Sequence, residues 1–204
     1  MTRISESLIL KRAQRKIHVG GLELEFQRTC RVPYDKTYGL PAGLGQFPIY
    51  NVEDFSDTAP KDWDRKDMFM PMYQCEALWI NFQRYRFENP SAVLVGSGAI
   101  NAVSGKKIEH YNLEEPQNYL SVPPQPWLDG WKDMDGKIYQ FVAADLGSGQ
   151  TVEGQITGEE KVGGIQLSVF KPKPDAKFSF HYFIVLRCLA FNAKFFPVPL
   201  YCSF

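Results

Sequence analysis

Residues 17–32, with the sequence IHVGGLELEFQRTCRV, contain the clearest strand pattern in the chain. A Gly-Gly pair, which is typical of a turn, is followed by Leu22, Leu24 and Phe26 in strict alternation with polar side chains. Successive side chains of a strand point to opposite faces of a sheet, so one face of this segment is apolar and the other polar. The stretch therefore predicts a half-buried strand with one face on the core.

Short apolar or alternating runs, separated by glycine-containing turns, predict further strands. They are AVLV (92–95), IYQFVAA (138–144), TVEGQIT (151–157) and GIQLSVF (164–170). The last three follow one another at short, regular spacing, which favours an antiparallel sheet. No alternation of strands and helices points to a parallel sheet.

One segment has helical periodicity instead. Within residues 72–87, apolar side chains follow the spacing i, i+3, i+4 and i+7, at Cys75, Leu78, Trp79 and Phe82. This spacing places them on one face of a helix. We therefore expect an α+β, β-rich fold: a mainly antiparallel sheet or sandwich with one principal helix near 72–87.

The size and composition of the chain fit one folded domain with flanking segments. It has 204 residues, of which 44% are hydrophobic and 23% charged, as is ordinary for a globular protein. We expect a basic N-terminal flank at 1–16, a single β-rich domain at 17–175 and an aromatic C-terminal tail at 176–204. The 23 basic residues balance the 23 acidic ones, so no global field attracts nucleic acid, and no such partner is expected.

The tail differs from the rest of the chain. After Asp175, the remaining 29 residues hold nine aromatic side chains and no carboxylate. Phe178, Phe180 and Tyr182 alternate as in a strand, so the tail is interpreted either as a terminal strand of the sheet or as a segment appended to a truncated domain. Its apolar run over 178–191 is shorter than the roughly 20 residues that span a membrane, so no transmembrane segment is expected.

Motifs for phosphate, metal or redox chemistry are incomplete. The GSG at 96–98 follows a predicted strand, but Asn101 stands where a dinucleotide fingerprint has its third glycine, so a hairpin turn is the better interpretation, as it is for the GSG at 147–149. The histidines and the four cysteines lack metal-ligand and C-x-x-C spacing, so no metal site and no cofactor are predicted. The N-terminus lacks the apolar core of a signal peptide, and a cytoplasmic location with reduced cysteines is expected.

A candidate binding surface lies within residues 125–159. The tryptophans of QPWLDGW (125–131), with Glu153 and Gln155 on one face of the predicted strand 151–157, would form an aromatic platform edged by carboxylate and amide groups. Such a surface suits a sugar or another polar ring, although core tryptophans and a solvated polar face give the same pattern. The predicted ligand-binding residues are Trp127, Asp129, Trp131, Gln140, Glu153 and Gln155.

Three classes of function fit this pattern. The first is a binding or interaction module for a polar small molecule, a sugar or a protein. The second is a hydrolase that uses carboxylates from Asp129, Glu153 and Glu159 as acid and base. The third is a structural protein without a small-molecule site. The sequence does not decide whether the protein is an enzyme.

Several blocks of the chain resemble a family of uncharacterised proteins found in bacteria and fungi. The blocks are PMYQCEALW (71–79), INAVSG (100–105), QPWLDG (125–130), QFVA (140–143), TVEGQITGE (151–159) and GGIQ (163–166). The similarity covers residues 31–173 and implies a longer chain beyond residue 174, where this sequence changes to the aromatic tail. One hypothesis is a truncated domain followed by a segment from altered splicing. The family brings no known activity, so the resemblance implies no catalytic residue.

Overall fold

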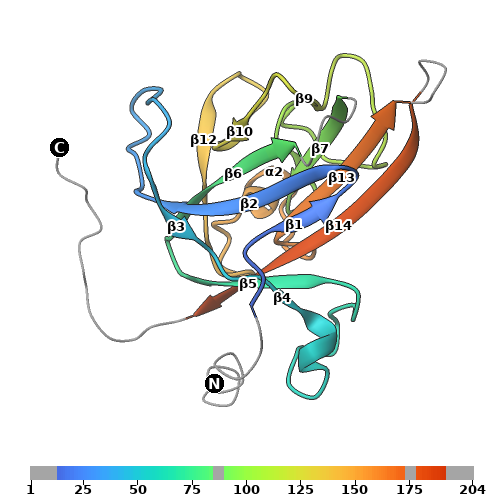
Figure 1. The fold of residues 1–204 in the computed structure, drawn as a ribbon. Coiled ribbons are helices and arrows are strands. Elements are labelled where there is room, and N and C mark those ends of the chain that lie inside the picture. The colour runs from blue at the N-terminus through green and yellow to red at the C-terminus, as the bar shows by residue number, and fades with distance from the viewer. Residues whose placement is uncertain (1–12, 85–89, 173–177, 192–204) are drawn as a thin grey trace.

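A computed structural model describes residues 13–84, 90–172 and 178–191, whose strands form two seven-stranded sheets packed face to face (Figure 1). The first sheet contains β1 (Ile17–Val19), β2 (Leu22–Thr29), β3 (Gly43–Gln46), β6 (Ala77–Arg84), β10 (Trp127–Leu128), β11 (Gly130–Lys132) and β12 (Ile138–Val142). The second contains β4 (Tyr50–Asn51), β5 (Met68–Tyr73), β7 (Ser91–Ser97), β8 (Ile100–Asn101), β9 (Leu120–Val122), β13 (Ile165–Pro172) and β14 (Phe178–Phe191). A short 3-10 helix, η1 (Val52–Phe55), and one α-helix, α2 (Val152–Thr157), complete the described elements. The predicted β-rich α+β class is confirmed.

The strand order shows how the two sheets are built. The first runs β1-β2-β6-β12-β11, with β3 beside β2 and β10 beside β6. The second runs β4-β5-β14-β13-β7-β8, with β9 beside β7. Among the paired strands of the described chain, β14 and β5 are parallel and every other pair is antiparallel. The mainly antiparallel arrangement is therefore as predicted.

The core forms where the apolar faces of the two sheets meet. Leu24 and Phe26 of β2 are fully buried, as the alternation in 17–32 predicts, and the Gly-Gly pair turns the chain from β1 into β2. Val93 and Leu167 from the second sheet join the same apolar cluster with no exposed surface. Each side chain of this size stabilises the fold by about 1.5–3 kcal/mol through the surface it removes from water.

The helix predicted near 72–87 is wrong. Residues 68–73 and 77–84 are the strands β5 and β6, and residues 85–87 lie outside the described chain. Leu78, Ile80 and Phe82 of β6 are buried at every second position, which is the period of a strand facing the core. Cys75 is exposed in the turn between the two strands and has a positive φ of 68°, so it does not belong to a buried helical stripe.

The strand predicted at 151–157 is also wrong, because this stretch forms α2. The Thr151 side chain caps the start of the helix by accepting a hydrogen bond from the Gly154 N–H at 3.0 Å. Gly158 ends it in the left-handed conformation and donates its N–H to the Gly154 carbonyl. Both ends of the helix are therefore specified by residues within the segment.

The tail contributes a long strand to the second sheet. Over Phe178–Phe191, β14 lies between β13 and β5, and Leu186 is registered with Ile165 on one side and Met68 on the other (Figure 1). The Arg187 guanidinium also contacts the Asp67 carboxylate at 2.8 Å, across 120 residues of sequence. The interpretation of the tail as a strand therefore holds for Phe178–Phe191, whereas residues 192–204 lie outside the described chain.

The N-terminal flank is described only from residue 13. Gln14 forms an isolated bridge with Ile49, and the proposed division at residue 16 stays a prediction. In the described chain, the helices lack the length and apolar character needed to cross a membrane.

Replacing Leu186 with alanine tests whether β14 is part of the core. Leu186 is fully buried, so Leu186→Ala should lower the free energy of unfolding by about 2–5 kcal/mol through lost burial and a residual cavity. Leu44, which is 57% exposed, supplies the matched control, and Leu44→Ala should change stability by less than about 1 kcal/mol. Urea unfolding followed by circular dichroism measures both. Equal stability of the two variants would show that β14 does not pack in the sheet.

Candidate ligand-binding cavity

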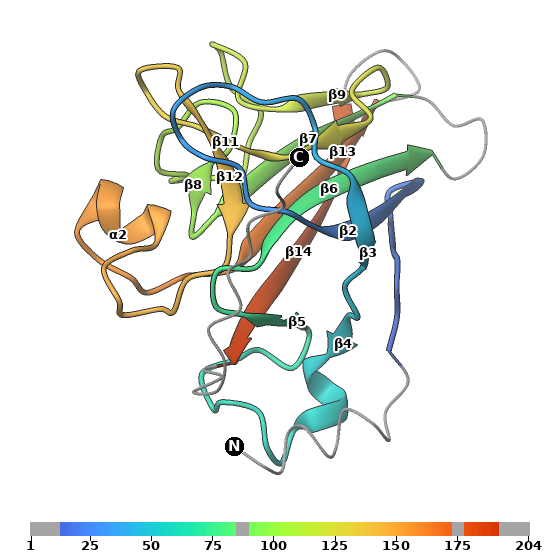
Figure 2. The ribbon, with the colours of Figure 1, turned by 90° about the vertical axis from the view of Figure 1, so that its left-hand side faces the viewer.

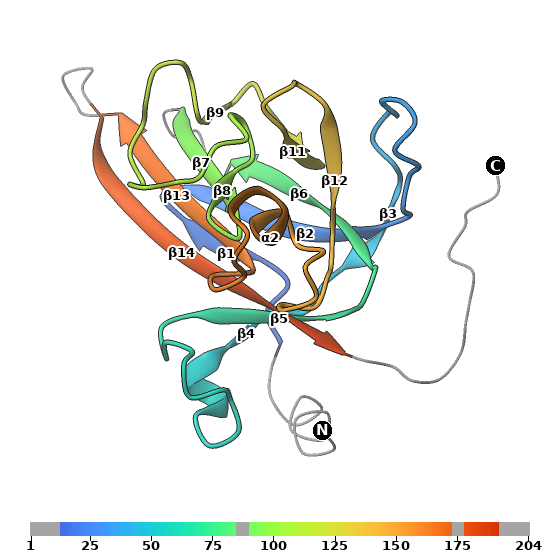
Figure 3. The same cartoon turned by 180° about the vertical axis from the view of Figure 1, so that it is seen from behind.

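A cavity of about 880 Å³ lies beside α2, where segments of both sheets meet. Figure 2 shows α2 and the loops on either side of it standing out from the strands on one side of the molecule, and Figure 3 shows α2 in front of the strands. The cavity wall includes the end of β12, the loop 144–151, part of α2, and residues of β13 and β14. Volumes of roughly 300–1,000 Å³ are typical of pockets that hold small molecules.

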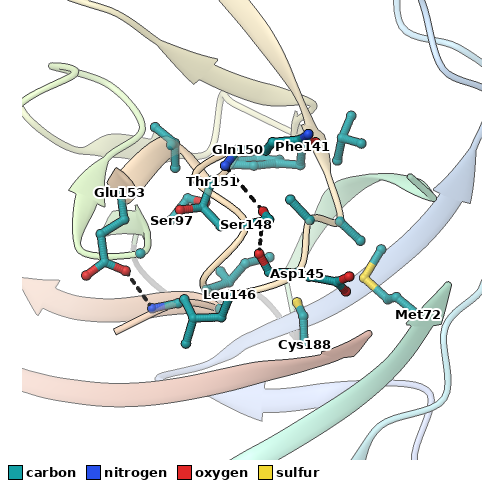
Figure 4. Close-up of a pocket in the computed structure, with 18 of the residues that line it drawn as sticks. Met72, Ser97, Phe141, Asp145, Leu146, Ser148, Gln150, Thr151, Glu153 and Cys188 are labelled. Atoms are coloured by element: carbon teal, nitrogen blue, oxygen red, sulfur yellow. Dashed lines mark hydrogen bonds between the residues drawn. The ribbon is translucent and has the colours of Figure 1, made fainter. Parts of the chain in front are cut away.

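Glu153, in the first turn of α2, fixes the loop that follows the helix. Its side chain is only 5% exposed, and its carboxylate accepts backbone N–H groups of Lys161, Val162 and Gly163 at 2.9–3.1 Å (Figure 4). Both carboxylate oxygens are therefore engaged by the protein backbone. Burial of the Tyr111 phenol raises its pKa, and the nearby negative charge of Glu153 raises it further.

Glu160 fixes the loop that precedes α2. Its carboxylate accepts the N–H groups of Gly149 and Thr151 and the Thr151 hydroxyl, at 2.5–3.1 Å. These bonds hold the pKa of Glu160 below its ordinary value, and the bond from the Thr151 hydroxyl has the largest effect. Backbone amides that a phosphate would need are thus occupied by a side chain of the protein itself, which agrees with interpreting the GSG at 147–149 as a turn.

The GSG at 96–98 forms a tight hairpin turn. β7 pairs with β8 through Ser97 and Ile100, and the two residues between them, Gly98 and Ala99, both have positive φ values, 55° and 59°. This is the geometry of a two-residue type I′ turn, so the predicted hairpin is confirmed. Ser97 ends β7 on the cavity wall (Figure 4).

Aromatic residues form another part of the wall. Trp131 of β11 and Tyr139 of β12 are directly opposite each other, with ring centroids 4.9 Å apart and planes at 17°. The Tyr34 ring lies 6.0 Å from that of Tyr139. Gln140 stands beside this group and binds the backbone of a neighbouring loop, donating to the Cys30 carbonyl at 2.9 Å and accepting the Val32 N–H at 3.1 Å.

Four of the six predicted ligand-binding residues line this cavity: Trp131, Gln140, Glu153 and Gln155. The other two, Trp127 and Asp129, are not among the described residues that line it. Because residues of an α-helix are about 100° apart, Glu153 and Gln155 point in different directions, and they do not share a face as on a strand. Gln155 is exposed and donates to the Gln150 carbonyl at 3.0 Å. Their role as ligand contacts stays a prediction.

The cavity also contains residues that the sequence patterns did not single out. Asp145 follows β12 and lines the same cavity as Met72 and Cys188 (Figure 4). Arg187 and Cys188 come from β14. Burial raises the pKa of the Cys188 thiol to about 12, so it stays protonated at neutral pH. A turn sequence such as that at 145–149 carries no signal that its aspartate faces a cavity.

The remaining reactive groups to consider are metal ligands and cysteines. Within the described residues, no group of three or more His, Cys, Asp or Glu side chains is arranged to hold a metal ion. Cys75 and Cys188 are free thiols, whereas Cys30 is disulfide-bonded. The expectation that all four cysteines are reduced is therefore wrong at Cys30.

Replacing Glu153 with glutamine tests its role in the loop. Glu153→Gln keeps the size of the side chain but turns an amide N–H₂ toward backbone donors, so the free energy of unfolding should fall by about 1–3 kcal/mol. Glu159 is the matched control because it is exposed and pairs with Lys161 at 2.8 Å. Glu159→Gln should change stability far less, because an ion pair in water contributes little. Urea unfolding compares the two, and equal effects would contradict the structural role of Glu153.

The lowered pKa of Glu160 makes the loop before α2 sensitive to acid. The contribution of its hydrogen bonds is fully present above the unfolded pKa of about 4.3 and is lost as pH falls through the lower folded pKa. The backbone amide resonances of Gly149 and Thr151 should therefore titrate with a midpoint below that of an ordinary glutamate. NMR measures this titration, which Glu160→Gln should abolish. A midpoint at or above the ordinary value would contradict the assignment.

No protein-family model, curated protein or solved structure matches this chain. The resemblance to a bacterial and fungal family, and the truncation that it implies, therefore stay predictions. The cavity and the residues that form it are the features of this chain that bear on its function.

Proposed function

We propose that this protein binds a small amphipathic molecule in the cavity beside α2. The observation that carries the proposal is the cavity itself, which has a volume of about 880 Å³ and is lined by apolar and aromatic side chains together with many polar ones. Small-molecule sites usually combine these features, because apolar walls supply affinity and a few fixed polar groups supply orientation. This narrows the predicted binding module to a small-molecule ligand.

The apolar wall suits the hydrocarbon or ring part of a ligand. Met72 and Leu78 are 2% exposed, and Ile165 is 3% exposed, so these core side chains form its inner surface. Leu146 and Val162, which are 53% and 39% exposed, line the same cavity nearer to solvent. A ligand that covers such surface gains about 25 cal/mol for each Å² removed from water.

The loops around the cavity are held in place by internal hydrogen bonds. Glu160 binds the segment before α2, and Glu153 binds the segment after it. Loops fixed in this way lose less conformational entropy when a ligand binds, so more of the contact energy appears as affinity. The arrangement supports a site that exists before the ligand arrives.

The geometry does not favour the alternative of a carboxylate-dependent hydrolase. Of its three proposed carboxylates, Glu153 alone lines the cavity, and both of its oxygens accept backbone N–H groups. Glu159 is exposed and paired with Lys161, while Asp129 is not part of the wall. An acid and a base must lie within reach of one bound substrate. The protonated thiol of Cys188 likewise lacks the thiolate that a nucleophile requires.

Two further points are the cellular location of the protein and the class of its ligand. The expected cytoplasmic location stays a prediction, and the disulfide bond at Cys30 does not favour it, because such bonds persist mainly in oxidising compartments. A small molecule fits the balanced charge of the chain better than a nucleic acid does.

Filling the cavity tests the proposal. Ser97 is half-buried on the cavity wall, and Ser97→Trp places an indole in the space that the ligand would occupy. The probe is an uncharged phenylbenzothiazole dye, whose fluorescence rises when it is held in a rigid apolar site. The wild-type protein should bind one dye per chain, and Ser97→Trp should weaken binding at least about tenfold, because apolar contact area is lost.

The matched control for this experiment is Ser56→Trp, at an exposed position that is not among the residues lining the cavity. It adds the same indole and should leave dye affinity unchanged. Circular dichroism checks that both variants are folded. No binding to the wild-type protein, or equal binding to both variants, would show that the cavity is not a ligand site.

A further inference from the structure

We infer that Asp145 selects a positively charged ligand, so that the molecule bound in the cavity carries an amine, ammonium or amidinium group on its apolar body. The inference rests on the proposed function and adds the charge class of the ligand. Asp145 differs from the other acidic residues around the cavity, because its carboxylate has no partner among the described residues.

Asp145 uses its backbone, and not its side chain, to shape the loop after β12. Its carbonyl accepts the Ser148 hydroxyl at 2.6 Å and the Ser148 N–H at 3.2 Å, and the same hydroxyl accepts the Gln150 N–H (Figure 4). Its carboxylate has no hydrogen bond or ion pair with the residues that the structure describes. The loop geometry is thus complete without the Asp145 charge.

The other carboxylates of this region are engaged by the protein. Glu153 and Glu160 accept backbone N–H groups, and Glu159 pairs with Lys161. A half-buried carboxylate that lacks such partners is costly, because burial removes water that would otherwise stabilise the charge. A ligand cation would replace that water at Asp145.

The net charge of the cavity wall also favours a cationic ligand. Among the residues that the structure describes, the charged side chains that line the cavity are the carboxylates of Asp145 and Glu153 and the guanidinium of Arg187. Asp67 contacts Arg187 at 2.8 Å and offsets its charge, and the guanidinium also lies 5.7 Å from the Trp63 ring centroid. The field in the cavity is therefore negative, which favours a cation over an anion.

The surroundings of Asp145 are suited to strong pairing. Asp145 lines the same cavity as the sulfur-containing side chains of Met72 and Cys188, which are weakly polar (Figure 4). Asp145 is half-buried, so part of the water around its carboxylate is already removed. Charges attract more strongly where water is excluded, so an ion pair here is worth more than one at the surface.

The test compares two dyes of nearly the same shape. Thioflavin T has a benzothiazolium ring whose methylated nitrogen gives it a positive charge, and the uncharged dye lacks that methyl group. Wild-type protein should bind thioflavin T about tenfold more tightly than the uncharged dye, because the cationic ring makes an ionic contact with a half-buried carboxylate. Asp145→Asn should remove this preference and leave affinity for the uncharged dye unchanged. Asp145→Ser serves as a second variant with a smaller neutral side chain.

Salt dependence gives an independent readout. Raising the ionic strength from about 0.01 M to about 0.15 M shortens the Debye length from about 30 Å to about 8 Å. Binding of thioflavin T to the wild-type protein should weaken, whereas binding of the uncharged dye to the wild-type protein should change little. Binding of either dye to Asp145→Asn should also change little. Glu159→Gln controls for the loss of one negative charge outside the cavity and should keep the wild-type preference.

The outcomes separate this inference from the proposed function. If neither dye binds in a way that Ser97→Trp prevents, the proposed function fails and the inference fails with it. If the uncharged dye binds the cavity but thioflavin T binds no more tightly, or keeps its advantage in Asp145→Asn, the inference alone is overturned. A preference lost in Asp145→Asn and kept in Glu159→Gln supports it.

Discussion

The second sheet is continuous because β14 lies between β5 and β13. Its backbone pairs with β13 on one side and with β5 on the other, so without it both neighbours would present unpaired N–H and C=O groups at an open edge. The cavity depends on the same strand, since Arg187 and Cys188 form part of its wall. Pairing of β14 therefore supports both the architecture and the site.

Around that frame, acidic side chains hold irregular segments in place. Glu76 accepts the Tyr73 N–H at 2.7 Å and pairs with Arg28 at 2.8 Å, which fixes the turn between β5 and β6. Glu153 and Glu160 act in the same way on either side of α2. Backbone amides outside regular structure need acceptors, and ionised carboxylates provide the stronger ones. Acidic residues in such loops are thus not by themselves signs of catalysis.

The strands that could be predicted are those with one consistent pattern. β2 alternates along its length, and β7, β12 and β13 lie within or around apolar runs bounded by glycine turns. Residues 72–87 could not be assigned correctly because Leu78 and Phe82 fit a helical spacing and a strand spacing equally well. The helix α2 is six residues long and too short for periodicity, although the threonine at 151 and the glycine at 158 mark its ends.

The site is harder to predict than the fold, because it depends on contacts between segments that are distant in sequence. The sequence predicts Trp131 and Glu153 as aromatic and polar members of a surface, and both line the cavity. The feature that sets Asp145 apart is the lack of partners for its carboxylate among the described residues, which depends on where other segments of the chain pass. Local sequence contains no information on that point.

The position of β14 in the sheet also constrains the order of assembly during synthesis. β5 and β13 are made before β14, yet they become neighbours in one sheet only when β14 pairs with both, and its contact between Arg187 and Asp67 spans 120 residues. Contacts over such separations slow folding, because a long loop must close before they form. In a ribosome-bound chain, β5 and β13 therefore each keep an unpaired edge until β14 emerges, and in that interval the chain is exposed to aggregation and to capture by chaperones.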